Sequence, residues 1–298
     1  MAIPESRKKK LQMLLRSIPP GNVTTADRMG PREGRDAELP ARRAREPISL
    51  RKACPGSVKS IQFGGRKAKF YLVRRPLAEV SPDSLPVERQ YASVMRGARQ
   101  NFDELSASPA MCCAANAGPE DLLFFDTETC GLAGSAVFLV GLMFYADGRL
   151  IFEQYLARDY AEEAAILAAF ARRYRQAGVL VTFNGKAFDM TLIRERSAFH
   201  GIRLPDPEPP HLDLLHESRR RWRQAVPNCR LQTLEAHFCG RRRVGDIPGA
   251  DIPDAYHDFV RTSDAARMRD ILHHNLLDLL TLAELLCAIL TGCEPAHQ

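Results

Sequence analysis

Residues 124–132 read FFDTETCGL. Asp126 and Glu128 stand two positions apart at the end of an apolar run of strand length. Successive side chains of a strand alternate between its faces, so both carboxylates are expected on one face of a sheet. An ionised carboxylate in apolar surroundings is costly unless a cation meets it. The pair therefore predicts a functional site, the alternative being a polar strand end.

Three further stretches bring an acid into or beside an apolar run: VTFNGKAFDM at 181–190, HLDLLH at 211–216 and HHNLLDLL at 273–280. The first has a turn at Asn184-Gly185 and then Asp189 in the opening turn of a helix, where the helix dipole favours negative charge. The others contribute Asp213 and Asp278. Carboxylates that converge without matching Lys or Arg partners indicate divalent metal, and oxygen ligands favour Mg²⁺ or Mn²⁺ over zinc.

Two histidines precede Asp278 on the expected last helix. His274 is four residues before Asp278 and shares its helical face. His273 is five residues before it and is rotated about 100° further round. Either ring can act as a general base toward water, because its pKa lies near neutrality. The preceding ARMRDIL continues the helical pattern without Gly or Pro, which favours His274.

The charge of the chain is unevenly distributed. Residues 1–100 hold 22 Lys and Arg against 9 Asp and Glu, whereas residues 101–298 hold 20 against 27. A basic front and an acidic back suggest a polyanionic partner, with a solubilising tail as the alternative. Apolar runs are too short for a bilayer span, and no secretory signal is recognised. Eight cysteines without a C-x-x-C pair favour reduced thiols in a cytoplasmic protein.

Two arginine clusters lie in the acidic part of the chain. Expected nucleic-acid contacts are Arg219, Arg220 and Arg223 around Trp222, followed by Arg241, Arg242 and Arg243. Arginines beside an aromatic suit phosphate contacts combined with base stacking. The alternative is a solvated helix face. Asp246 to Gly249 read as a rigid loop before the last helix.

The order of the expected elements indicates a mixed α/β fold. Residues 1–60 are rich in Arg, Pro and Gly and are expected to be a basic, disordered arm. Residues 61–118 are expected to hold a small hairpin and a linker. Residues 119–293 read as three strands, a helix, a strand, a helix, a strand and further helices. This order fits a ribonuclease H-like domain, a mixed five-stranded sheet flanked by helices.

The motifs of this domain resemble a known family. They are DTETCGLAGSAVFLVGL, VTFNGKAFD, HLDLLHESRRRWR, CRLQTLEAHFCG, GDIPGADIP and HNLLDLLTL, and together they cover about residues 120–290. Asp126, Glu128, Asp189 and Asp278 look like the metal-binding set of the DEDD (DnaQ-like) 3′–5′ exonuclease superfamily. The whole domain resembles the YprB-type ribonuclease H-like family within it. His274 has the spacing of the family's Tyr-x3-Asp motif, and His273 that of its His-x4-Asp motif.

The resemblance implies an enzyme that hydrolyses phosphodiester bonds of DNA or RNA with two divalent ions and no small-molecule cofactor. The four acids would hold the ions, with Asp213 and Asn184 as auxiliary residues. A structure-specific endonuclease on the same fold, a non-catalytic nucleic-acid-binding module and a protein-interaction scaffold are the alternatives. Protein partners are not indicated.

Overall fold

The structure, a computed structural model, describes residues 46–80, 85–101, 107–131 and 134–295. Residues 1–45 of the expected N-terminal arm (residues 1–60) therefore lie outside the described residues. Pro47–Gln298 form one compact unit. Regular structure begins before residue 60, with α2 at Leu50–Ala53. The hairpin expected as a separate region belongs to the same unit as the domain that follows it.

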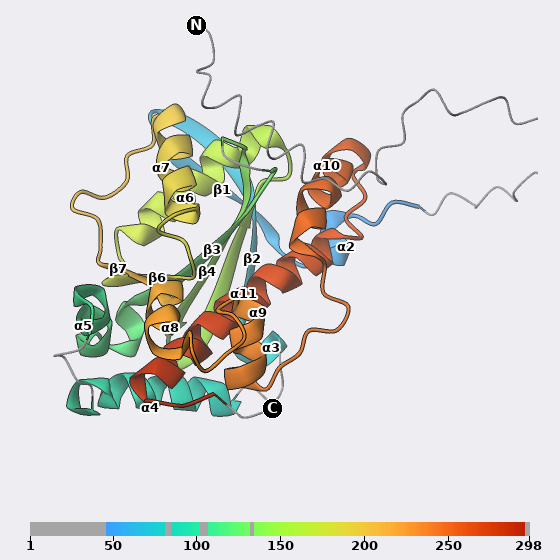
Figure 1. Cartoon of the computed structure of the whole chain (residues 1–298). Helices are drawn as coiled ribbons and strands as arrows, with labels where there is room; N and C mark the ends of the chain where they lie inside the picture. The colour runs from blue at the N-terminus through green and yellow to red at the C-terminus, as the bar shows by residue number, and fades with distance from the viewer. Residues whose placement is uncertain (1–45, 81–84, 102–106, 132–133, 296–298) are drawn as a thin grey trace, which may run out of the picture. The chain divides into compact units, whose positions relative to one another are not determined.

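A single mixed sheet forms the centre of this unit (Figure 1). Its strands are β1 (Ser57–Phe63), β2 (Arg66–Pro76), β3 (Leu122–Thr129), β4 (Val137–Ala146), β5 (Arg149–Leu156), β6 (Val179–Thr182) and β7 (His211–Asp213). They lie in the order β1-β2-β5-β4-β3-β6-β7. The β3–β6 and β6–β7 pairs are parallel, and the others are antiparallel.

The α/β prediction is confirmed, but the sheet has seven strands and not five. The difference comes from the β1–β2 hairpin, because β2 pairs with β5 from Tyr71 to Pro76. Without the hairpin, β5 would present a row of unpaired backbone groups, which is an unfavourable sheet edge. Sequence periodicity identifies a hairpin but not the strand to which it adds.

Helices cover both faces of the sheet. The longer ones are α4 (Leu85–Asn101), α5 (Pro109–Asn116), α6 (Glu163–Tyr174), α7 (Asp189–Phe199), α8 (Leu214–Trp222), α10 (Ile252–Thr262) and α11 (Met268–Leu290). The short ones are α3 (Leu77–Val80), α9 (Leu231–Leu234), η4 (Pro119–Asp121), η5 (Tyr160–Glu162), η6 (Glu235–Cys239) and η7 (Gly249–Asp251). Helices α6 and α7 pack on one face, while α4, α5 and most of α11 pack on the other (Figure 1).

Successive side chains of β3 point to opposite faces of the sheet and so contribute to the two separate halves of the core. On one face, the Phe125 ring packs against Phe170 of α6 with centroids 4.6 Å apart. On the other, Phe124 meets Tyr91 of α4 at 5.8 Å. Asp126 and Glu128 continue the face of Phe124. Both acids therefore point to the side of the sheet that α11 covers.

Helix α11 is long and apolar enough to cross a membrane by length and composition alone. However, 72% of its apolar window is buried inside the folded unit. Its apolar positions pack against the sheet and against α4 and α8. The hydropathy of this segment is therefore accounted for by its place in the core.

A polar contact interrupts the apolar packing between α11 and the sheet. Asn275 of α11 is fully buried, and its Nδ2 donates to Asp126 Oδ2 at 2.8 Å. Its Oδ1 accepts a hydrogen bond from Gln154 Nε2 at 2.9 Å. Gly141 is the register partner of both Asp126 and Gln154. The Asn275 amide thus lies over Gly141 and joins the two flanking strands.

Gly141 provides the space for this contact. A Cβ at this position would lie 2.1 Å from Asn275 Oδ1 and 2.5 Å from its Nδ2. These distances are far inside van der Waals contact, and the neighbour is a fully buried amide held on both sides. The apolar strand VFLVGLMFYA therefore carries its glycine where α11 approaches closely.

We expect Gly141→Ala to destabilise the folded unit by about 1–3 kcal/mol, the usual cost of forcing extra atoms into a packed interior. The measurement is the free energy of unfolding from a urea titration. Gly249→Ala is the matched control, because a Cβ there meets nothing within 4 Å. A Gly141→Ala chain as stable as the Gly249→Ala chain would show that Asn275 does not need this space.

Candidate active site

Strand β3 presents two of the predicted acids at its end. Its first four residues are buried and its last four are half-buried, so the strand passes from the core to an accessible edge. The pairing with β4 has an irregularity between Glu128 and Thr129, where the ladder ends. Asp126 and Glu128 are therefore in the last regularly paired part of β3, where side chains of other elements can reach them.

Helix α7 brings the third acid to this edge. Asp189 is its first residue, and its Oδ1 accepts a hydrogen bond from the Thr127 hydroxyl at 2.5 Å. This contact holds Asp189 at the end of β3, where its charge raises the pKa values of Asp126 and Glu128. The parallel β3–β6 pair explains the approach, because β6 leads directly into the loop before α7.

The loop between β6 and α7 depends on the two residues predicted to be auxiliary. Asn184 has a left-handed backbone with φ of 64°, a conformation that Asn tolerates better than most residues. Asp213 is buried and accepts hydrogen bonds from the backbone N–H groups of Asn184 at 2.7 Å and Lys186 at 3.1 Å. It also accepts one from Leu215 N at 3.1 Å, which caps α8. Asp213 therefore orders the loop that presents Asp189.

Helix α11 supplies the fourth acid and the histidines. The helix already runs from Met268, so His274 and Asp278 share one face, with His274 Nε2 3.5 Å from Asp278 Oδ2. His274 Nδ1 lies 2.8 Å from Asp246 Oδ2. His273 is exposed, and the protein atoms around its ring still displace enough water to lower its pKa. The geometry brings His274 to the acids.

The pKa values of Asp126 and Glu128 are raised by burial and by the charges of nearby acids. Burial is the largest cause for Asp126, followed by the charges of Asp278, Glu128 and Asp189, while the Asn275 bond acts in the opposite direction. Burial also raises the pKa of Glu128 well above its usual range, and Asp278, Asp189 and Asp246 add to the effect. Burial raises the pKa of Asp189 and of Asp278 as well. The four side chains thus form one group of interacting carboxylates.

The donor chemistry of this group fits a divalent ion. Charged neighbours that perturb Glu128 are all carboxylates, so a cation would relieve repulsion that nothing else offsets there. One oxygen of Asp246, Oδ1, is buried without a hydrogen-bond partner. In the positions that the described side chains adopt, no three His, Cys, Asp or Glu form a ready-made metal cluster. The carboxylate oxygens are ligands that suit Mg²⁺ or Mn²⁺. The acidic side chains would have to move closer together to bind an ion.

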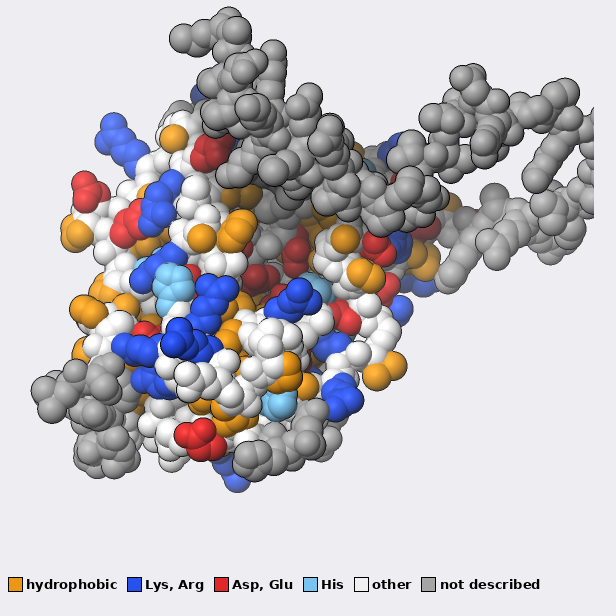
Figure 2. Space-filling view, viewed as in Figure 1, with side chains coloured by type: hydrophobic (Ala, Val, Ile, Leu, Met, Phe, Trp, Pro, Cys, Tyr) orange, Lys and Arg blue, Asp and Glu red, His pale blue; other side chains and the backbone are white. Residues whose placement is uncertain are grey.

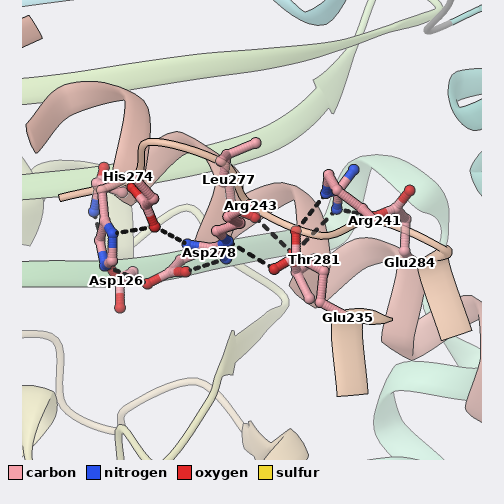
Figure 3. Close-up of polar contacts among 11 residues, drawn as sticks. Asp126, Glu235, Arg241, Arg243, His274, Leu277, Asp278, Thr281 and Glu284 are labelled. Carbon is pink, nitrogen blue, oxygen red and sulfur yellow. Dashed lines mark hydrogen bonds and ion pairs between the residues drawn. The ribbon is translucent and has the colours of Figure 1, made fainter. Parts of the chain in front are cut away.

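Asp278 has a cationic partner that the sequence motifs do not reveal (Figure 3). Its Oδ1 lies 2.6 Å from Arg243 Nη2. The same arginine contacts Glu235 at 2.7 Å and Asp246 at 3.3 Å, and its side chain is only 5% exposed. The assumption that the acids lack a matching Lys or Arg is therefore wrong for Asp278. The motif around Asp278 does not identify this partner, because Arg243 lies in a loop 35 residues upstream.

Part of the predicted nucleic-acid surface lies inside the protein. Trp222 is 3% exposed and packs on Phe238 with ring centroids 3.9 Å apart, so its indole is not presented to a base. Arg241 pairs with Glu235 and with Glu284, and Arg243 is buried as described above. These placements do not fit the expected stacking and phosphate contacts. Arg242, in the same loop, is exposed.

The arginines of α8 line an open pocket. It has a volume of about 680 Å³ and is bordered by Arg219, Arg220, Arg221, Arg223, Gln224, Asn228 and Cys229. Arg220 and Arg221 also pair with the buried Glu217. Figure 2 shows a gathering of Lys and Arg side chains over this region, on the same face of the molecule as acidic side chains in a hollow. The pocket supports the predicted anion surface at this first cluster.

Three residues of the site were not among the predicted ones. Asn275 holds Asp126, Asp246 contacts His274, and Glu235 anchors Arg243. The sequence offers a sign of the role of Asn275, because it is a lone amide in an apolar helical segment. Asp246 was interpreted only as part of a rigid loop. Glu235 gave no signal, because its role depends on the fold of the η6 segment.

The fold and the grouped acids define a ribonuclease H-like protein, and the comparisons with known proteins agree. The model of the RNase_H superfamily family RNase_H_2 matches residues 123–290. The chain therefore belongs to the ribonuclease H superfamily, and the resemblance to its YprB-type branch is confirmed. Membership supports a nuclease that processes nucleic acid.

Two similar proteins show the extent of the match. "Uncharacterized protein YprB" of Bacillus subtilis (strain 168) is 37% identical over 169 residues, or 55% of this chain and 41% of that protein. The chain thus matches less than half of the length of this relative. The family B DNA polymerase of the hyperthermophilic archaeon Pyrobaculum calidifontis is similar in structure over 55% of this chain and 24% of that one. Its TM-score is 0.44 at 19% identity.

The raised pKa of Glu128 predicts how stability depends on pH when chelator removes metal. An unfolded Glu has a pKa of about 4.3, and the folded value is higher. Between these values the folded chain binds more protons, so its stability falls as pH rises. Glu128→Gln lacks this charge. It should therefore be more stable than the wild type at pH 7.5.

The measurement is urea unfolding of both chains in EDTA at pH 7.5 and pH 5. The advantage of Glu128→Gln should shrink at the lower pH, because the wild-type carboxyl is then closer to protonation. Glu195→Gln, at an exposed position on α7, is the control and should change little. Equal stability of wild type and Glu128→Gln at both pH values would contradict the repulsion.

Proposed function

We propose that this chain is a 3′–5′ exonuclease that hydrolyses phosphodiester bonds of nucleic acid with two divalent ions, Mg²⁺ or Mn²⁺. The observation that carries the proposal is the grouping of Asp126, Glu128, Asp189 and Asp278 with His274 from three separate elements. The superfamily match supports a nuclease. The polarity and the exonuclease mode rest on the resemblance of the four acids to the DEDD set.

The four acids and the side chains that hydrogen-bond to them would have different roles in this reaction. Asp126, Glu128, Asp189 and Asp278 would hold the ions, which, when bound, polarise the scissile phosphate and lower the pKa of water. Asn275 keeps Asp126 in place by donating to its Oδ2. Thr127 does the same for Asp189. Asp126 and Asp189 are therefore held before substrate arrives, and groups fixed in this way favour electrostatic catalysis.

His274 is the proposed general base. Its Nδ1 faces Asp246 at 2.8 Å, so a proton on Nδ1 is stabilised by that carboxylate. The remaining nitrogen, Nε2, then carries the lone pair and faces the acid set near Asp278. This nitrogen would accept the proton of the attacking water. The hydrogen-bond pattern supports this division of roles within one ring.

Two surface features support a nucleic-acid substrate. The arginine-lined pocket of α8 offers positive charge for a phosphate backbone. Phe188, which immediately precedes Asp189, is 66% exposed. An exposed aromatic ring beside the acids can stack on a base, an interaction that tolerates any sequence.

The test is incubation of the chain with end-labelled single- and double-stranded DNA and RNA in Mg²⁺, Mn²⁺ or EDTA. We expect stepwise shortening from the 3′ end in either metal and none in EDTA, because the carboxylates need the ions to approach a phosphate. Asp126→Ala is the inactive control. Cleavage that persists in EDTA would contradict the metal-dependent mechanism, and internal fragments would instead indicate the endonuclease alternative.

The two histidines give a matched pair of variants. His274→Ala should lower the rate of cleavage by about 10²–10⁴, the usual loss when a general base is removed. His273→Ala should change it little, because His273 is exposed on the neighbouring position of α11. Single-turnover rates at saturating Mg²⁺ make the comparison. A larger loss in His273→Ala than in His274→Ala would reverse the assignment.

A further inference from the structure

Strand β1 is an open edge of the central sheet. Among the described residues it pairs only with β2, and it stands first in the order of the strands. An edge strand presents a row of backbone N–H and C=O groups that no neighbouring strand uses. The opposite edge strand, β7, has three residues, whereas β1 has seven. The sheet therefore has one long edge at which a further strand can pair.

A groove follows this edge, and we call it the β1 groove. One part of it has a volume of about 720 Å³ and the next a volume of about 280 Å³, and both parts are bordered by Ser60, Ile61 and Arg172. Along the strand the groove is lined by the consecutive residues 59–64. Successive side chains of a strand point to opposite faces, so such a groove meets β1 from its edge. The backbone of β1 is therefore accessible in the groove.

Helix α6 and the segment after α7 form the other side of the β1 groove (Figure 1). Ala168 and Ala171 of α6 and Ile202 after α7 are buried, so the floor of the groove is apolar. The family model matches residues 123–290, which leaves β1 and β2 outside the match. The β1 groove thus lies between the matched domain and the β1–β2 hairpin.

The β1 groove is positively charged. Arg172, Arg175 and Arg203 of its lining are exposed, and none of them forms an ion pair with an acid of the described residues. Arg175 donates instead to the carbonyl of Arg203. Among the described residues that line the groove, Glu153 is the one acid, and it already has an arginine partner. Residues 57–76 hold six Lys and Arg and no Asp or Glu.

The charge of the β1 groove selects an acidic occupant. Lys59, Lys67 and Lys69 would repel a second copy of the same edge, which is a common way to prevent pairing between like edges. Residues 1–45 hold 11 Lys and Arg against 5 Asp and Glu, so their charge does not match the groove either. A segment that carries acids at regular intervals is attracted by the same lysines and arginines.

The accessible backbone favours an extended peptide over nucleic acid. Phosphates need only positive charge, whereas a strand edge offers hydrogen bonds that another peptide backbone can match at every second residue. Arg172 and Arg175 are three residues apart, so their Cβ atoms lie about 5–6 Å from each other. Alternate residues of a strand are about 6.6–6.8 Å apart. Acids at every second position of an added strand can therefore reach both arginines.

We propose that the β1 groove binds an acidic, extended segment of a partner protein, which pairs with β1 as a further strand of the sheet. Backbone hydrogen bonds to the edge would fix the register of the segment, and its Asp or Glu side chains would contact Arg172, Arg175 and Arg203. The inference goes beyond the proposed function, because no residue that lines the β1 groove belongs to the group of acids around Asp126.

The test is binding of a fluorescein-labelled, end-capped octapeptide of alternating Val and Glu, measured by fluorescence anisotropy with the full chain in EDTA. Valine favours an extended backbone, and glutamate supplies the charge. We expect saturable binding that weakens with added salt and no binding of the corresponding Val and Lys octapeptide. An absence of binding at millimolar concentrations of the Val and Glu octapeptide would overturn the proposal.

A pair of variants locates the charge that attracts the peptide. Arg172→Gln should weaken binding about two- to fivefold, the usual range for the loss of one exposed ion pair. Arg149→Gln is the matched control, because it removes the same charge from an exposed position outside the groove. It should leave the affinity unchanged. Equal losses in the two variants would contradict binding in the groove, because net charge alone would then explain them.

Two N-methylated forms of the octapeptide test strand pairing. One form carries the methyl groups on its valine amides and the other on its glutamate amides. A strand pairs with its neighbour through alternate residues, so only one of these two sets of amides is needed. One form should therefore lose binding and the other should keep it. Equal affinities of the two forms would show that strand pairing does not occur.

Hydrogen exchange identifies what covers the edge. Backbone amides of β1 that face away from β2 should become protected when the Val and Glu octapeptide binds, because they then donate hydrogen bonds. Protection of these amides in the free chain would show that the chain itself or a second copy already covers β1. Protection by an oligonucleotide and not by the octapeptide would assign the groove to nucleic acid. Either result would overturn the assignment to a partner protein.

Discussion

The structure depends on the contact that Asn275 makes across the sheet. This amide joins Asp126 of β3 to Gln154 of β5 over Gly141 of β4. A buried amide is costly unless its donor and acceptor are both used, and here both are. The contact fixes the rotation and height of α11 on the sheet. His274 and Asp278, one residue before and three after, are thereby set beside the acids of β3.

The contacts around the four acids differ in how much negative charge they balance. A buried group of carboxylates is unfavourable, and the neighbouring side chains compensate it to a different extent at each acid. Asp189 receives the Thr127 hydroxyl, Asp126 receives an amide, and only Asp278 receives an arginine. Glu128 is left with carboxylate neighbours. The site is therefore most negative at the end of β3, where an incoming cation gains the most.

The loop from Arg241 to Pro248 has an unexpected part in the site. In the sequence it looks like a surface arginine run followed by a turn. In the structure Arg243 and Asp246 face inward and contact Asp278 and His274. A run of arginines can serve as a solvated surface or as counter-charge, and composition does not distinguish them. Only the buried Glu235, which draws two of these arginines inward, decides between the two.

The sequence by itself determined the α/β class, the four acids and the helical face shared by His274 and Asp278. These follow from local periodicity, because side chains repeat every two residues in a strand and every 3.6 residues in a helix. Acids at positions where this pattern predicts apolar residues stand out. The shared face of His274 and Asp278 could be predicted because helix phase is a local property, whereas the role of His274 as base stays a prediction. Asp213 was recognised as buried and polar, although its role in ordering a loop was left open.

Only the tertiary structure decided which distant groups meet these residues. The addition of the hairpin to β5, the burial of Trp222, the Asn275 contact and the Arg243–Asp278 pair each join segments far apart in the chain. Local pattern specifies which face of an element is polar or apolar, but not the partner that the face meets. That partner is set by how whole elements pack, because burial is non-directional while hydrogen bonds and ion pairs need a particular approach.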